Sequence, residues 1–201
     1  MTATKQIAKT LRKELKGVKE TGTDYSALQR QRLQEFRKQK TTIARIKRPT
    51  NLPRAKNLGY RAKQGIILVR VKIRKGSGKH PRPTAARKPK RMGVKKLTRK
   101  KSIKRIAEER TAKKFKNCEV LNSYTVGSDG KNHYYEIILV NTAHPVIKKD
   151  KKLAWLRKSK SRQRAFRGLT SAGKKGRGLR KKGKGAEKAR LTQKRHKKRL
   201  K

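Results

Sequence analysis

The segment Gly168-Leu-Thr-Ser-Ala-Gly173-Lys174-Lys175 comes closest in this sequence to a known chemical motif. It matches the phosphate-binding loop of nucleotide hydrolases, except that Lys175 occupies the position of the Ser or Thr that holds magnesium. That loop must follow a buried strand, whereas the residues before Gly168 are basic and polar. We therefore reject nucleotide hydrolysis and interpret the glycines as backbone that can pass close to the phosphates of a nucleic acid.

The other titratable residues show no catalytic or metal-binding arrangement. The four histidines lie in unrelated contexts, and Cys118 is the only cysteine, so neither an internal disulfide nor a multi-cysteine zinc site can form. The adjacent carboxylates Glu108 and Glu109 are expected to pair with neighbouring basic residues. We predict no enzymatic activity, no cofactor of the chain's own and no small-molecule substrate.

The charge of the chain decides its class of partner. It has 65 Lys and Arg against 11 Asp and Glu in 201 residues, a formal net charge of +54, with 31% hydrophobic and 4% aromatic residues. Such a chain repels itself and cannot bury a core along its whole length, so its partner must be a polyanion, by default a nucleic acid. No apolar run approaches the ~18 residues of a membrane span. The start of the chain lacks a secretory signal, so we expect a cytosolic or nuclear protein without a membrane partner.

The basic residues are concentrated in two long stretches. Residues 36–107 hold 27 Lys and Arg and no carboxylate, and residues 157–201 hold 21 with six glycines and one acid. Between them, residues 108–156 have nine basic and six acidic residues, close to an ordinary balance. One basic run could be a solvated tail or a nuclear-import signal, but two separate stretches favour direct contact with nucleic acid through counterion release.

The apolar pattern predicts an α+β fold with a small, mostly antiparallel sheet and packed helices. Alternation over 66–73 predicts a half-buried strand, and Ser102 can cap a helix that runs to about residue 115. Asp-Gly within 127–132 predicts a hairpin between strands at about 118–126 and 133–141.

We predict three parts in the chain: N-terminal basic helices at 1–47, an α+β body at 48–156 with a basic loop at 75–101, and an extended Gly/Lys/Arg-rich tail at 157–201. The first helix is expected over 3–20, and Asp24 can cap the second. Pro49 and Pro53 indicate an irregular connector over 47–59. A structureless loop as long as 75–101 is reasonable only if another macromolecule orders it.

Four segments occur in a characteristic order: Asn57-Leu-Gly-Tyr-Arg-Ala-Lys-Gln-Gly65, Ile106-Ala-Glu-Glu-Arg110, Val120-Leu-Asn-Ser-Tyr124 and Phe166-Arg-Gly-Leu-Thr-Ser-Ala-Gly173. Together they resemble the large-subunit ribosomal protein fifteen family of archaea and eukaryotes, which is distinct from the bacterial protein of that number. The resemblance extends from about Gln29 to Ala189 and is closer to archaeal members.

The resemblance implies a structural component of the large ribosomal subunit, with a small α+β body, long extensions through the ribosomal RNA (rRNA) and no catalytic role. Its expected partners are large-subunit rRNA and neighbouring ribosomal proteins. We expect a cytoplasmic protein on the ribosome that does not form homo-oligomers. Any Mg²⁺ is expected to be associated with the bound rRNA.

The candidate rRNA contacts come from two sources. Motif by motif, the resemblance implies Lys63, Gln64, Arg74, Lys75, Arg167, Gly168, Lys174 and Arg177. The basic stretches add Arg54, Lys79, Arg82, Arg87, Lys90, Arg91, Arg99, Lys100, Arg164, Phe166 and Arg180. Phe166 has no apolar partner nearby in the sequence, so we expect it to insert against an unstacked base or into a protein groove. Arginines should contact phosphates or base edges in a bidentate way, and lysines should act mainly as point charges.

The sequence leaves two other classes of function open. A chromatin or DNA-compacting protein would be equally basic, although the Arg/Gly-rich tail and the predicted hairpin fit that class poorly. An RNA-modifying or nucleotide-hydrolysing enzyme would need a convergent acid–base set, and the sequence does not show one.

Overall fold

A four-stranded antiparallel sheet forms the centre of the protein. The computed structural model describes residues 2–20, 22–78, 81–94 and 98–180. The strand order is β3 (Ile43–Ile46), β4 (Ile66–Arg74), β6 (Asn132–Asn141), β5 (Cys118–Ser128). Two short strands, β1 (Lys19–Glu20) and β2 (Thr23–Asp24), pair separately. The α+β fold class predicted from the sequence is confirmed.

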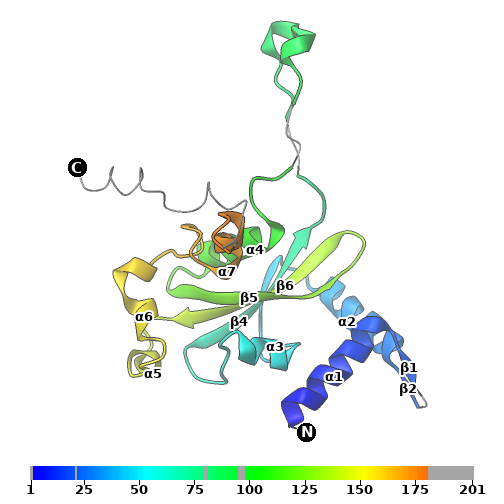
Figure 1. Ribbon diagram of the computed structural model, residues 1–201, viewed down its shortest axis with the longest axis vertical. Helices are drawn as coiled ribbons and strands as arrows, with labels where there is room; N and C mark the ends of the chain where they lie inside the picture. Colours follow the sequence, from blue (N-terminus) through cyan, green and yellow to red (C-terminus); the bar gives the residue numbers. More distant parts are fainter. Residues whose placement is uncertain (1, 21, 79–80, 95–97, 181–201) are drawn as a thin grey trace.

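Helices cover both faces of this sheet, with α4 and α7 on one side and α3 on the other (Figure 1). The α-helices are α1 (Ala3–Lys16), α2 (Tyr25–Lys38), α3 (Leu52–Asn57), α4 (Ile103–Lys114), α5 (Pro145–Lys148), α6 (Ala154–Arg157) and α7 (Ser171–Gly176). The short 3₁₀ helices are η1 (Ala85–Arg87), η2 (Pro89–Arg91) and η3 (Ser159–Ser161).

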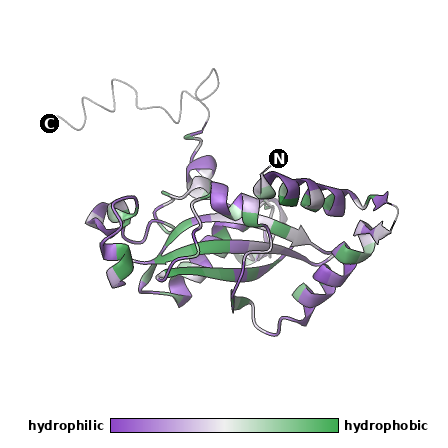
Figure 2. Ribbon diagram, turned by 90° about the horizontal axis from the view of Figure 1, so that it is seen from below, coloured by the Kyte–Doolittle hydropathy of each residue, from purple (hydrophilic) through white to green (hydrophobic). Residues whose placement is uncertain are grey.

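The sheet has apolar residues on both faces. Strand β4 alternates as predicted, with Val69, Val71 and Ile73 buried and Arg70 and Lys72 partly exposed. On one face Val71 and Ile137 pack with Ala107 of α4. On the other face Leu68 and Ile138 form a smaller cluster with residues of α3. Apolar residues are accordingly concentrated in the strands of the sheet, whereas the helices are largely hydrophilic with scattered hydrophobic positions (Figure 2).

A buried ion pair joins the strands on the α3 side of the sheet. Arg70 and Glu136 are direct partners in the β4–β6 register, and Arg70 Nη2 lies 3.2 Å from Glu136 Oε1. Glu136 also accepts hydrogen bonds from the Tyr124 hydroxyl (2.5 Å) and the Thr50 backbone N–H (3.1 Å). The Arg70 guanidinium stacks 4.1 Å above the centre of the Phe36 ring. One carboxylate thus holds β4, β5, β6 and the segment before α3 together.

The predicted hairpin between β5 and β6 is confirmed. Asp129 closes its turn by accepting hydrogen bonds from the backbone N–H groups of Lys131 (2.8 Å) and Asn132 (2.6 Å) and from the Tyr134 hydroxyl (2.7 Å). Burial acts to raise the pKa of Asp129. These hydrogen bonds and the charge of Arg37 outweigh burial and lower this pKa to about 2.

The helix caps follow the predicted chemistry, but some boundaries differ. Asp24 caps α2 by accepting from the Ser26 and Ala27 backbone N–H groups, and Ser102 caps α4. The first helix ends at Lys16 rather than near residue 20, because Gly17 adopts a left-handed conformation with φ +65°.

Two elements of the body, α3 and β3, and the burial of Phe36 were not predicted. The connector over 47–59 is not irregular throughout, because Asn51 caps the short helix α3 there. Strand β3 adds to the edge of the sheet beside β4, and Phe36 of α2 is fully buried. Both β3 and Phe36 precede residue 48, where we expected the body to begin.

The basic loop after β4 contains only short 3₁₀ turns in its described residues, and residues 81–94 lie well away from the sheet (Figure 1). Ala85, Ala86 and Arg87 all have positive φ angles, between 45° and 52°. Three consecutive non-glycine residues in the left-handed region are strained, which fits a segment whose shape depends on a partner.

Replacing Glu136 by alanine should lower the free energy of unfolding by about 3 to 5 kcal/mol, because the partly buried Arg70 would lose its ionic partner and the buried Tyr124 hydroxyl would lose its acceptor. Urea denaturation of the full chain measures this. The control is Glu35→Ala on the exposed side of α2, which should change stability by less than about 0.5 kcal/mol. Equal effects of the two substitutions would contradict the role given to Glu136.

The low pKa of Asp129 predicts a pH-dependent contribution to stability. Its ionised form stabilises the fold above its ordinary pKa of 3.8, and this contribution is lost as the pH falls toward 2. The difference in free energy of unfolding between the wild type and Asp129→Asn should therefore shrink over that range. A difference that stays constant from pH 5 to pH 2, measured by denaturant titration, would contradict this assignment.

Candidate nucleic-acid interface

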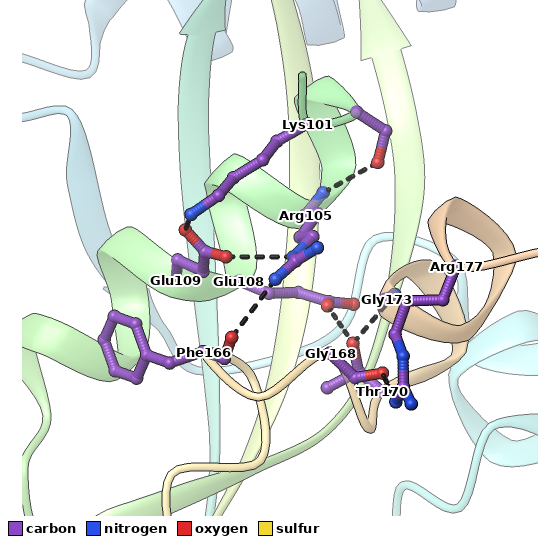
Figure 3. A network of polar contacts seen from close by, with 10 residues as sticks. Lys101, Arg105, Glu108, Glu109, Phe166, Gly168, Thr170, Gly173 and Arg177 are labelled. Atoms are coloured by element: carbon purple, nitrogen blue, oxygen red, sulfur yellow. Dashed lines mark hydrogen bonds and ion pairs between the residues drawn. The ribbon is translucent and has the colours of Figure 1, made fainter. Parts of the chain in front are cut away.

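The buried carboxylate of Glu108 attaches the start of the C-terminal segment to α4 (Figure 3). Its Oε2 accepts a hydrogen bond of 2.5 Å from Thr170 Oγ1, and its Oε1 accepts one from the Ser123 hydroxyl. Burial raises the pKa of Glu108, although these hydrogen bonds and the charge of Lys104 oppose the shift. The expectation that Glu108 forms an ion pair with a basic neighbour is therefore wrong: its closest partners are two hydroxyl groups.

Glu109, the adjacent carboxylate, behaves as predicted. It accepts a hydrogen bond of 2.9 Å from Arg105 Nε and one of 2.7 Å from Lys101 Nζ. Because consecutive helical residues point in different directions, Glu108 and Glu109 contact different partners. Glu108 holds the C-terminal segment, and Glu109 orients cations at the surface of α4.

The glycines of the near-motif permit a close contact within the protein. A Cβ atom on Gly173 would lie 2.5 Å from the Cα of Gly168, and Gly168 itself has φ +67°. Thr170 caps α7 by accepting a hydrogen bond of 3.2 Å from the Gly173 N–H. Our interpretation of Gly173 as backbone free to approach a phosphate is therefore wrong.

The extended tail predicted from residue 157 consequently starts with a packed segment. Ala165, Thr170 and Ala172 are buried against the body, and α7 forms at 171–176. Residues 181–201 of the predicted tail lie outside the described residues.

Arg164 is one predicted RNA contact that the structure places in the interior. Its Nη1 donates a hydrogen bond of 2.8 Å to the Leu121 carbonyl and another to the Val120 carbonyl. Its guanidinium stacks 4.8 Å from the centre of the Trp155 ring. Because the Arg164 guanidinium already makes these contacts within the protein, we correct its assignment from rRNA contact to structural residue.

Three cations from other parts of the chain lie close enough to Lys104 to act on its charge. Lys104 of α4 lies near Arg54 of α3 and near Lys175 and Arg180 of the C-terminal segment. Burial lowers the pKa of Lys104, Glu108 raises it, and the three neighbouring positive charges lower it further. We call these four residues the α4 cation cluster. Sequence reasoning selected Arg54 and Arg180 but missed Lys104 and Lys175, because only the fold brings the four together.

Two further arginines are held by backbone carbonyl groups of the turn before α7 (Figure 3). Arg105 Nη2 donates a hydrogen bond of 3.1 Å to the Phe166 carbonyl, and Arg177 Nη1 donates one of 3.4 Å to the Gly168 carbonyl. Each guanidinium keeps donors beyond these single contacts. The turn that precedes α7 therefore holds one arginine from α4 and one from the residues after α7.

The remaining predicted contacts are spread over the surface. Exposed positions are Arg74, Arg82, Arg87, Lys90, Arg91, Lys100, Gln64, Phe166, Arg167 and Lys174. Lys75 is half-buried, and Arg99 Nη2 donates a hydrogen bond of 3.4 Å to the Arg74 carbonyl. Lys63 forms an ion pair of 3.0 Å with Asp150, and Lys79 lies outside the described residues.

The acids of the protein do not neutralise this surface. Within the part of the chain that the structure describes, seven ion pairs form, and they involve seven different cations. Other acids are used in local bonding: Asp24 caps a helix, and Glu119 accepts hydrogen bonds from the backbone N–H groups of Gln163 (2.8 Å) and Arg164 (3.4 Å). Most surface cations are therefore available to an external polyanion.

Two further observations concern the described residues alone. They contain no group of three or more His, Cys, Asp or Glu that could hold a metal ion. No helix among them is long and apolar enough to cross a membrane.

Comparison with known proteins decides the family. The family model described as Ribosomal L15 matches residues 7–196. The chain belongs to the ribosomal L15e family. The large ribosomal subunit protein eL15 of the archaeon Methanocella arvoryzae is 58% identical over 158 residues, which are 79% of this chain and 80% of the relative. The resemblance stated from the four sequence segments is thus confirmed. Membership in the L15e family gives the chain a structural role in the ribosome and implies that it is not an enzyme.

The packing of Gly173 in this L15e chain makes a direct prediction. Gly173→Ala should lower the free energy of unfolding by about 1 to 3 kcal/mol, because the added methyl group overlaps the Gly168 backbone. Limited trypsin digestion should then cleave the C-terminal segment faster.

The matched control is Gly176→Ala in the same helix, where an added Cβ meets no atom within 4 Å. This substitution should be neutral or slightly stabilising, because alanine favours helix over glycine. Similar behaviour of the two variants would contradict the close approach of Gly173 and Gly168.

Proposed function

We propose that this L15e protein is a constituent of the large ribosomal subunit in the cytoplasm, where it binds and stabilises folded rRNA by neutralising phosphates. Its partners are then large-subunit rRNA and neighbouring ribosomal proteins, and it acts as a single copy without a small-molecule substrate. The family and the name of the archaeal relative support the location on the large subunit.

The α4 cation cluster is the observation that carries the proposal. Burial and the three neighbouring positive charges disfavour the charged form of Lys104 and lower its pKa, although the nearby Glu108 carboxylate opposes this shift. A nearby phosphate would favour the charged form and reduce the repulsion. A group of cations whose mutual repulsion a polyanion would relieve is typical of a phosphate-binding surface.

The two basic stretches extend this surface. Residues 36–107 supply Arg54 and the basic loop, and residues 157–201 supply the segment around α7. We propose that the exposed arginines and lysines predicted from the sequence contact rRNA phosphates, without Arg164. Because A-form grooves offer side chains little sequence information, recognition would depend mainly on RNA shape.

The test compares the salt dependence of binding for two fourfold variants. One variant replaces all four residues of the α4 cation cluster (Arg54, Lys104, Lys175 and Arg180) by glutamine. The slope of the logarithm of the binding constant against the logarithm of the salt concentration should then become shallower by up to about 3 to 4, because about one counterion is released for each phosphate contact. The measurement uses the full chain and protein-free large-subunit rRNA at several stated salt concentrations.

The matched control replaces two lysines and two arginines of the N-terminal helices, Lys5, Lys9, Arg12 and Arg30, by glutamine. It makes the same change in net charge away from the cluster and should change the slope less. Equal slopes for the two variants would mean that binding follows net charge alone. Equally tight binding of duplex DNA at the same salt would favour a general polyanion binder over an rRNA scaffold.

A further inference from the structure

A groove runs between the end of α4, the start of β5 and residues 156–166. It consists of two hollows of about 690 Å³ and about 290 Å³, which share Lys116, Glu119 and Gln163 in their walls. Sites for small organic ligands commonly have volumes of about 300 to 1,000 Å³. The groove is thus large enough for a nucleotide. None of the residues of the α4 cation cluster lines it.

The groove is positively charged. Lys116, Arg157 and Arg162 line its larger hollow, and Lys113 lines the smaller one. Among the described residues in its walls, Glu119 is the one acid, and its carboxylate oxygens accept hydrogen bonds from the backbone of residues 163 and 164. Four cations therefore face one acid that is already hydrogen-bonded, which favours an anionic ligand.

The walls also offer a surface for a flat ring. Phe166 lines the smaller hollow beside Ala112, and its side chain is 42% exposed. Two side-chain amides, Asn117 and Gln163, line the same groove and can each donate and accept hydrogen bonds.

Gln163 has a strained backbone at the centre of this groove. Its φ is +52°, a left-handed conformation that L residues other than Asn and Asp seldom adopt. The hydrogen bond from its backbone N–H to Glu119 helps to hold it there. Strain of this kind is concentrated at ligand-binding sites, because it fixes a side chain where an unstrained backbone would not place it.

We propose that this groove binds one or two unpaired nucleotides of rRNA, with a base stacked on Phe166. The amides of Asn117 and Gln163 hydrogen-bond the edges of the base, and the surrounding lysines and arginines neutralise its phosphates. Cations, an exposed aromatic ring and amides together form the combination by which proteins hold splayed-out RNA bases. The inference rests on the proposed function and adds a site specific for unpaired RNA to the general binding of phosphates.

The experiment uses the full chain with two RNA probes of equal length. One is a hairpin with a loop of unpaired purines that contains 2-aminopurine, and the other is a fully paired duplex. Phe166→Ala should weaken hairpin binding by about 5- to 150-fold, the range for loss of one stacked base, and should leave duplex binding and the salt dependence unchanged. The 2-aminopurine fluorescence, which is quenched by stacking, should rise in the complex with this variant.

Two further variants separate ligand binding from folding. Leu28→Ala removes a side chain of similar exposure (43%) from α2 and should leave binding of both probes unchanged. Gln163→Gly removes the amide but suits the left-handed backbone, so it should weaken hairpin binding without loss of thermal stability. A residue that acts only in folding would not give that combination.

The outcomes distinguish the two proposals. Equal loss of hairpin and duplex binding in Phe166→Ala, or no loss in either, would overturn the base-binding groove and leave the phosphate-binding function in place. The latter result would favour a protein partner at Phe166. Failure of the wild-type chain to bind either RNA would overturn the proposed function itself.

Discussion

The scarcity of acidic residues is the constraint on which the rest of the structure depends. With 11 acids for 65 basic residues, the fold cannot neutralise its own surface, and several of its carboxylates are used in contacts within the protein. Glu136 joins the strands of the sheet, Glu108 attaches the C-terminal segment to α4, and Asp129 closes the hairpin. The cations that do not take part in these contacts are available to bind an external polyanion.

These internal carboxylates explain how a chain of such charge can form a body at all. Glu136 compensates the partly buried Arg70, and at the surface Glu109 orients Arg105 and Lys101 on α4. The hydrophobic layers on the two faces of the sheet supply the remaining stabilisation near the balanced part of the sequence. The folded body therefore presents its excess charge in fixed positions, such as the α4 cation cluster, instead of along a random coil.

Local patterns predicted the local elements well. The alternation before and after the Asp-Gly turn predicted β5 and β6, and Asp24 and Ser102 predicted the starts of α2 and α4. Strand β3 is only four residues long, and α3 only six, so neither gives a clear periodic signal.

The interface was less predictable, because it depends on contacts between distant residues. The hydrogen bond between Glu108 and Thr170 joins residues 62 positions apart, and it places Lys175 and Arg180 beside Lys104. Arg164 is one of several arginines in a basic run, and nothing in its local sequence distinguishes the buried one from its exposed neighbours. Phe166 was selected from the sequence because it lacks apolar neighbours, but its groove is formed by α4, β5 and the residues around Gln163.

The central claim is that the fixed cationic surface of this L15e protein binds and stabilises folded large-subunit rRNA. Hydroxyl-radical footprinting of that rRNA, with and without the full chain, tests this most directly. The account predicts localised protection of the RNA backbone in a few neighbouring helices, at stoichiometric protein and near-physiological salt. Unchanged protection on addition of the protein, or weak protection spread uniformly along the RNA, would contradict it.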